Sequence, residues 1–185
     1  FNKHAKDIAA VIVEPIAGNM GFIEPNEDFL QNLRQICTEN KSILIFDEVM
    51  TGFRVARGGA QELFNIDPDL TALGKIVGGG LPVGVYGGKK EIMDNIAPDG
   101  PIYQAGTLSG NPIAVSAGTA LLKQLKDQKI YEKLEKNAKN FLKIIKDYCD
   151  QNKIPFSFSA RGGMFGFFFS KNLPKNFDEV ENTDI

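Results

Sequence analysis

The sequence contains few of the residues on which many catalytic and metal sites depend. Among 185 residues there is one histidine, His4, no tryptophan, and only two cysteines, Cys37 and Cys149. The cysteines lie far apart and form neither a metal-spaced nor a redox pair. The chain therefore has almost none of the residues needed for serine–histidine or cysteine–histidine catalysis, or for a histidine-based zinc site. Thiols without a partner are typical of a reducing compartment, which favours the cytoplasm.

An excess of one charge and a long apolar run are also missing. The 21 basic and 23 acidic side chains give a net charge of −2, and no basic stripe is present, which argues against a nucleic-acid partner. No apolar stretch approaches the roughly 20 residues that a membrane-spanning helix needs, and the N-terminus does not resemble a secretion signal. A hydrophobic content of 43% is ample for the core of one domain, or of one domain and part of another.

The order of apolar runs predicts an α/β fold with a mostly parallel central sheet and flanking helices. Residues 8–14 form an apolar run that ends on Glu14, as expected for a strand buried on both faces. A helix over residues 26–40 and a strand over residues 42–47 complete a βαβ unit. Ligands of such sheets gather beyond the carboxyl ends of the strands, where Glu14 and Asp47 both fall.

Later segments are expected to continue this sheet and then to open a smaller α+β unit. The predicted helices cover residues 59–64, the segment after Ser109 or Asn111, and residues 129–152, and the predicted strands cover residues 70–73, 83–86, 155–159 and 164–169. The helix capped by Ser109 or Asn111 is rich in small residues, so we expect it to be buried against a neighbouring backbone. The polar tail over residues 171–185 is expected to be a loop or an interrupted element.

Asp47 and Lys75 are the most informative pair in the chain. Asp47 ends an apolar run, and Lys75 follows 28 positions later (75 − 47) among glycines. A pyridoxal phosphate enzyme needs an amine that condenses with the cofactor aldehyde and a carboxylate that keeps the pyridine nitrogen protonated, so that the ring accepts electrons. Because aspartates often end strands and lysines are common in surface turns, the spacing alone also leaves a purely structural interpretation open.

Three blocks that stand in the same order resemble the class III aminotransferase family. They are DEVMTGFR at residues 47–54, LGKIVGGGLPVG at residues 73–84 and YQAGTLSGNP at residues 103–112. The resemblance runs from about residue 8 to about residue 169. It implies a fold like that of aspartate aminotransferase, a pyridoxal phosphate cofactor that passes through its pyridoxamine form, and a homodimer with shared active sites.

The resemblance also implies how the chain is divided. Residues 1–127 would be the second half of the cofactor-binding large domain, and residues 128–185 the beginning of the small C-terminal domain. Family members are more than twice as long, and this chain begins with Phe1, so we expect an internal fragment without the upstream phosphate-binding loop.

The same resemblance assigns two catalytic residues and further cofactor contacts. Lys75 is expected to form the covalent link with the cofactor and to move protons, and Asp47 to contact the pyridine nitrogen. The remaining cofactor contacts are Val49 on the ring face, Asn19 near a ring oxygen, and Gly106 with Thr107 at the phosphate across the dimer interface. Structural roles remain open for three of them: a core position for Val49, a turn for Asn19 and a helix cap for Thr107.

Within the family, the run over residues 50–61 favours an intramolecular amino shift in a small amino-aldehyde substrate. Transfer to a keto acid by an ω-aminotransferase and an inert fragment are the alternatives. The triple glycine at residues 78–80 lacks the spacing of a dinucleotide fingerprint, and no GxxxxGK segment exists for a nucleoside triphosphate. Arg54 and Arg57 could bind a substrate carboxylate, but arginines that flank a loop are more often surface charges, so they are not included among the site residues.

Overall fold

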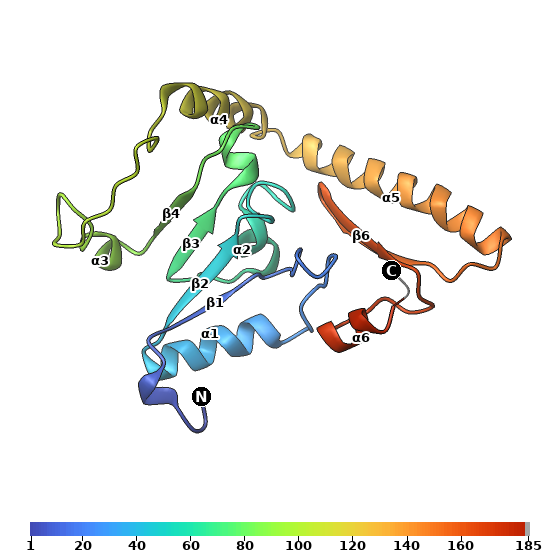
Figure 1. Cartoon of the computed structure of the whole chain (residues 1–185), viewed down its shortest axis with the longest axis horizontal. Helices are drawn as coiled ribbons and strands as arrows, with labels where there is room; N and C mark the ends of the chain where they lie inside the picture. The colour runs from blue at the N-terminus through green and yellow to red at the C-terminus, as the bar shows by residue number, and fades with distance from the viewer. Residues whose placement is uncertain (184–185) are drawn as a thin grey trace.

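A four-stranded sheet forms the centre of the computed structural model, which describes residues 1–183 (Figure 1). Its strands are β1 (Ala10–Val13), β2 (Ile43–Glu48), β3 (Leu70–Leu73) and β4 (Val85–Gly88), in that order. The first three strands are parallel, and β4 runs antiparallel to β3. The predicted mostly parallel α/β sheet is therefore confirmed, and β3 has the bounds that the sequence indicated.

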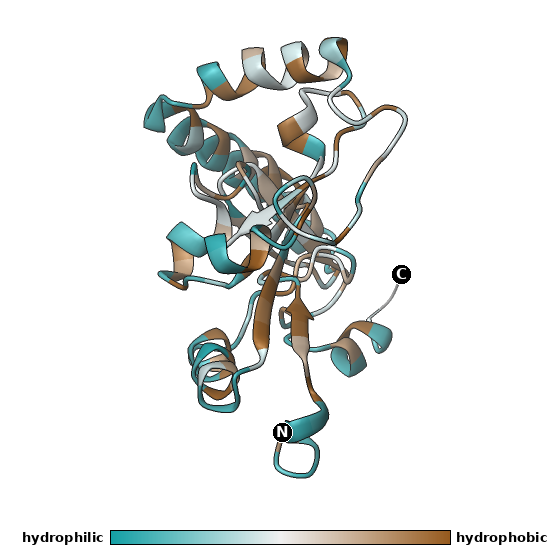
Figure 2. Ribbon diagram, turned by 90° about the vertical axis from the view of Figure 1, so that its left-hand side faces the viewer, coloured by the Kyte–Doolittle hydropathy of each residue, from teal (hydrophilic) through white to brown (hydrophobic). Residues whose placement is uncertain are grey.

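Two helices, α1 (Phe29–Asn40) and α2 (Gly59–Phe64), pack on one face of this sheet. Leu30 and Cys37 of α1 form a buried core with Leu44 and Phe46 of β2 and with Ile66. The apolar residues of α1 recur at helical spacing, which puts them on the side that faces the sheet. Figure 2 shows that hydrophobic residues follow the central strands, whereas the helices carry both polar and hydrophobic residues.

The prediction that the first strand is buried on both faces is wrong. Val11 and Val13 pack against the core beneath α1, but Ile12 lies on the opposite face and is 63% exposed. A parallel strand is buried on both faces only where helices cover both. Within residues 1–183, α1 and α2 both lie on the face that carries Leu44, Phe46 and Glu48, which leaves the side chain of Ile12 uncovered.

The remaining elements follow the predicted order, with shifts of a few residues. They are η1 (Ala5–Asp7), η2 (Lys75–Gly78), α3 (Lys90–Met93), α4 (Pro112–Gln124), α5 (Gln128–Gln151), β5 (Ser157–Arg161), β6 (Met164–Phe168) and α6 (Phe177–Glu181). The sequence did not indicate η1, η2 or α3, and α6 is the interrupted element of the tail. Among the described helices, none is long and apolar enough to cross a membrane.

The strands β5 and β6 form a separate antiparallel hairpin on which α5 packs (Figure 1). Two hydrogen bonds tie this unit to the loop over residues 49–58: the Gly163 N–H donates to the Arg54 carbonyl at 2.9 Å, and the Tyr131 hydroxyl donates to the Phe53 carbonyl at 3.3 Å. A shared core also joins them, since Met164 packs with Val55. The division of the chain at residue 127 into two domains stays a prediction.

Candidate active site

Lys75 stands two residues beyond the end of β3 and begins the short helix η2. Its backbone has a φ of +47°, a left-handed conformation that is uncommon for a residue other than glycine. Strain of this kind persists only where the surrounding structure holds it, and it is concentrated at functional sites. The side chain of Lys75 is exposed, so its amine is available to a ligand.

Helix α4 approaches the turn that carries Lys75 very closely. A Cβ at Gly79 would lie 2.5 Å from the Ala117 carbonyl oxygen, and a Cβ at Gly118 would overlap the carbonyl oxygen of Val77. The predicted contact through small residues is thus confirmed. Burial of the whole helix is wrong, because only Ala114 and Gly118 are buried and the residues on its other faces are exposed.

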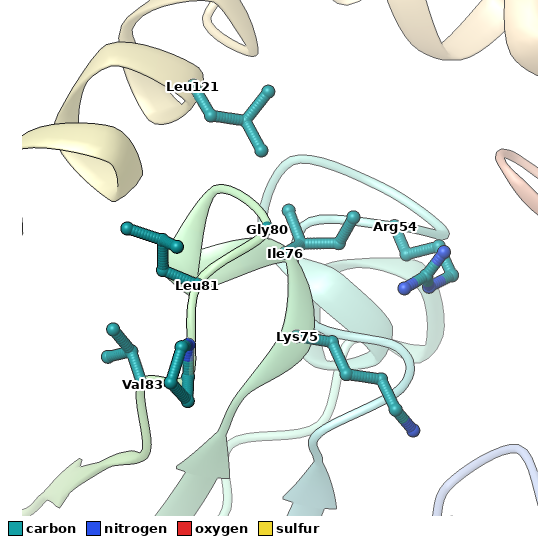
Figure 3. Close-up of a pocket in the computed structure, with 8 residues that line it drawn as sticks. Arg54, Lys75, Ile76, Gly80, Leu81, Val83 and Leu121 are labelled. Atoms are coloured by element: carbon teal, nitrogen blue, oxygen red, sulfur yellow. The ribbon is translucent and has the colours of Figure 1, made fainter. Parts of the chain in front are cut away.

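A cavity of about 630 Å³ opens beside Lys75. Its lining residues are Arg54, Lys75, Ile76, Gly80, Leu81, Pro82, Val83 and Leu121. In Figure 3 the nitrogen-bearing ends of Lys75 and Arg54 lie on the same side of Ile76, and Leu81 and Val83 lie on the other. Apart from these two cations the walls are apolar or glycine. The cavity therefore offers positive charge along one part of an apolar surface.

Asp47 is brought to the same edge of the sheet as Lys75. It pairs in register with Ala72, three residues before Lys75, and neighbouring strands are only about 4.8 Å apart. Its carboxylate accepts a hydrogen bond from the Val49 N–H at 3.1 Å. Because successive residues of a strand point to opposite faces, Asp47 faces away from the side that α1 and α2 cover. Asp47 does not line the cavity beside Lys75.

Val49 and Asn19 also lie at carboxyl ends of strands. Val49 packs against the segment that leads to Lys75, since a Cβ at Gly74 would lie 3.2 Å from Val49 Cγ1. Asn19 follows β1, and its side-chain amide donates to Glu14 at 2.6 Å. Glu14 also accepts from the Gly18 N–H at 2.9 Å, so it orients this turn.

Gly106 and Thr107 lie on the exposed loop before α4, and neither lines the cavity beside Lys75. Gly106 lines a second cavity, of about 280 Å³, which shares Pro82 and Val83 with the cavity beside Lys75. The alternative role of Thr107 as a helix cap is wrong. The cap is Asn111, whose side-chain oxygen accepts from the N–H groups of Ile113 and Ala114 at 3.0 and 3.2 Å.

Sequence reasoning missed the role of Glu48, whose side chain is buried at 1% exposure. Its carboxylate accepts from the Thr51 hydroxyl (2.8 Å), the Ala60 N–H (2.6 Å), and the backbone N–H (3.2 Å) and side-chain amide (2.9 Å) of Gln61. Gly59 has a φ of +69°, and any Cβ there would overlap this carboxylate. The signal that could have indicated this clamp is an acid at the end of a strand, Glu48, together with a glycine at the start of the next helix, Gly59.

The sequence favours a surface charge for Arg54, but the structure places it in the cavity wall beside Lys75. Its Nε donates to the Met50 carbonyl at 2.8 Å. Arg57, three residues later, is exposed and lines neither cavity. The two arginines, equivalent by sequence, thus occupy different environments.

The strand, turn and lysine arrangement agrees with the comparison to known families. A model described as Aminotransferase class-III matches residues 1–183, and the chain belongs to this family. Over all 185 residues it is 52% identical to a glutamate-1-semialdehyde 2,1-aminomutase from Legionella pneumophila (strain Paris) and covers 43% of that protein. The chain thus spans less than half the length of the curated relatives that it matches.

Solved structures agree on the fold. An omega-transaminase from Sphaerobacter thermophilus superposes with a TM-score of 0.90 at 30% identity, over 97% of this chain and 41% of that one. A glutamate-1-semialdehyde aminomutase from Pseudomonas aeruginosa, in complex with PMP, superposes with a TM-score of 0.85 at 25% identity, over 99% of this chain and 42% of that one. The predicted aminotransferase-like architecture is therefore confirmed.

Proposed function

We propose that the whole protein is a glutamate-1-semialdehyde 2,1-aminomutase. It would be a pyridoxal phosphate-dependent isomerase that moves the amino group within glutamate-1-semialdehyde and yields 5-aminolevulinate for tetrapyrrole synthesis. The observation that carries this proposal is the 52% identity to curated aminomutases along the entire chain. The PMP complex of the Pseudomonas aeruginosa neighbour supports the cofactor.

The residues at the carboxyl edge of the sheet fit this cofactor. When bound, pyridoxal phosphate supplies a ring that accepts electrons from the substrate carbon. Lys75 has an exposed amine that would hold the cofactor covalently and then carry protons between carbons. Asp47 would keep the pyridine nitrogen protonated from the neighbouring strand, while Val49 would pack on the ring and Asn19 would contact a ring oxygen.

The phosphate group would lie at a subunit interface. Gly106 and Thr107 would reach the cofactor of a neighbouring copy of the protein. Helix α4, which has 13 residues, begins shortly after them in the same chain, and its N-terminus favours an anion nearby. The segment around them is rich in exposed apolar side chains, among them Tyr103 at 83% and Ile113 at 73% exposure. Such a surface favours a homodimer. The two free, buried cysteines favour the cytoplasm as the location.

An ω-aminotransferase is the second candidate, because the Sphaerobacter thermophilus neighbour carries that name at 30% identity. Supplying the whole protein with glutamate-1-semialdehyde and no keto acid separates the two. We expect 5-aminolevulinate to form, measured by a colour assay or mass spectrometry, because an intramolecular shift needs no second substrate. A strict requirement for a keto acid would reject the aminomutase.

Lys75→Ala is the matched variant in that experiment, with Lys90→Ala, an exposed lysine of α3, as its control. Borohydride reduction in the presence of pyridoxal phosphate should add the cofactor mass to the peptide that contains residue 75. Lys75→Ala should lose both the label and the formation of 5-aminolevulinate. Lys90→Ala should keep both. If the 185-residue chain alone takes no label but the whole protein does, the isolated chain is inert. Labelling of another lysine would contradict the assignment of Lys75 as the residue that binds the cofactor covalently.

A further inference from the structure

Arg54 has hydrogen-bonding capacity that the described chain does not use. Its Nε is occupied by the Met50 carbonyl at 2.8 Å, which leaves the two terminal nitrogens of the guanidinium. Within residues 1–183 no aspartate or glutamate forms an ion pair with Arg54. The group lines the cavity that Lys75 also lines (Figure 3).

The backbone that presents Arg54 is held at several points. Glu48 fixes the start of the loop through Thr51 and its end through the N–H groups of α2. The Arg54 carbonyl itself accepts the Gly163 N–H at 2.9 Å. A side chain on a backbone fixed in this way is preorganised, so ligand binding does not have to order it.

Burial of Arg54 without a counter-charge is unfavourable. Loss of hydration lowers the pKa of its guanidinium, and no carboxylate within the described residues compensates. A half-buried cation is stabilised by an anion that enters the same space. A carboxylate is the matching group, because its two oxygens can accept from the two terminal nitrogens together.

We propose that Arg54 binds the carboxylate of an acidic substrate whose amine or aldehyde end reaches Lys75. The inference rests on the proposed function for the substrate, which then is glutamate-1-semialdehyde. Since Nε is already used, the carboxylate meets the guanidinium end-on through its terminal nitrogens. Arg54 thereby selects acidic amino-aldehydes over neutral ones.

The test compares Arg54→Gln and Arg54→Lys with Arg57→Gln in the whole, cofactor-loaded protein. Arg57 is a matched control, because it lies in the same loop but is exposed and outside the cavity. We expect Arg54→Gln to raise KM for glutamate-1-semialdehyde by about 10-fold to 100-fold, the cost of a hydrogen-bonded charge pair, with a much smaller change in kcat. Arg54→Lys, which keeps the charge but not the fork, should fall in between.

Binding of glutarate, a dicarboxylate without the reacting groups, separates this proposal from the identity of the reaction. Its dissociation constant, measured by calorimetry, should rise by a similar factor in Arg54→Gln and stay within about twofold in Arg57→Gln. That result can hold even if the protein proves to be an aminotransferase.

Three other outcomes would overturn the assignment. An unchanged glutarate affinity in Arg54→Gln is one. Weaker retention of pyridoxal phosphate with unchanged KM would identify the cofactor phosphate as the anion. A lower melting temperature with unchanged KM and unchanged glutarate binding would identify an acidic side chain elsewhere in the whole protein as the partner.

Discussion

At the scale of single residues, the adjacent carboxylates of Asp47 and Glu48 have different environments for a simple geometric reason. Successive side chains of β2 point to opposite faces of the sheet. Asp47 faces the side without α1 and α2, whereas Glu48 is buried against the N-terminus of α2. A buried carboxylate is tolerated when several donors replace its hydration, and Glu48 has four.

Glu48→Gln should therefore destabilise the protein although the side chain keeps its size. The amide has one acceptor oxygen instead of two, and its NH2 group would face the N–H and O–H groups that now donate to the carboxylate. At least one buried N–H therefore loses its partner. We expect the free energy of unfolding to fall by about 1–3 kcal/mol, measured by urea denaturation. Glu62→Gln is the control, since Glu62 accepts from the Gly58 N–H at 2.8 Å but is exposed. Equal effects of the two substitutions would contradict the clamp.

The sequence indicated Asp47 and Lys75, because each has a local signature, a strand end in one case and a glycine-rich turn in the other. It could not separate Arg54 from Arg57. Both are arginines of one loop, and only the packing of that loop against the hairpin turn at Gly163 and against Lys75 decides which one lines the cavity. The left-handed backbone of Lys75 likewise depends on η2 and α4, which local sequence does not report.

At the scale of elements, Asp69 joins four parts of the sheet layer. Its carboxylate, just before β3, accepts from Arg34 of α1 at 2.8 Å, from the Leu44 N–H of β2 at 2.7 Å, and from Lys89 after β4 at 2.6 Å. Burial alone would raise the pKa of Asp69, but the hydrogen bonds from Lys89, Leu44 and Arg34 outweigh it and hold the pKa below its usual value. The charged form is thus favoured in the folded state.

Asp69→Asn should lower the free energy of unfolding at neutral pH by about 3 kcal/mol. This value is at the lower end of the destabilisation seen when a buried ion pair is broken, because Lys89 is partly exposed. Since the folded pKa of Asp69 lies below the unfolded value of about 3.9, its contribution is complete above that pH and is lost as the pH falls through the folded pKa. The gap between wild type and variant, followed by urea denaturation from pH 6 downward, should narrow below about pH 4.

Asp94→Asn provides the comparison, because Asp94 pairs with Lys90 at 2.6 Å on the surface of α3. Exposed pairs contribute about 0–1 kcal/mol, so this variant should remain close to wild type at every pH. A gap for Asp69→Asn that does not change with pH would show that the charge of Asp69 is not what stabilises the layer.

Periodicity in the sequence predicted most elements within a few residues, and it failed where an element's surroundings decide. The run over residues 8–14 has the composition of a strand with two buried faces, yet Ile12 is exposed, because both helices of this layer lie on the other side. Local pattern reports that a residue is apolar. Which face is covered depends on where other segments pack, and those contacts are distant in sequence.

At the scale of the whole molecule, the extended segment between β4 and α4 is the least self-sufficient part of the chain (Figure 1). Tyr103 and Leu108 in this segment, and Ile113 and Val115 at the start of α4, all expose large apolar surfaces. Monomeric proteins rarely leave a contiguous apolar region of this kind in water, whereas an interface buries it. The proposed homodimer would bury this surface and would also place Gly106 and Thr107 beside a neighbouring active site.

Ile113→Glu tests that arrangement in the whole protein. Ile113 is 73% exposed at the start of α4, so a glutamate there should not disturb the fold of a monomer, but a charge buried at an interface without a partner is costly. We expect the molar mass from light scattering after size exclusion to fall from dimer toward monomer. Retention of pyridoxal phosphate should weaken as well, because in the proposed dimer the phosphate contacts would come from the second subunit. Ile144→Glu on α5, at 71% exposure, is the matched control and should leave the mass unchanged.

A dimeric mass for Ile113→Glu with normal cofactor retention would place the subunit interface on another surface, and the exposed residues before α4 would then need a different partner.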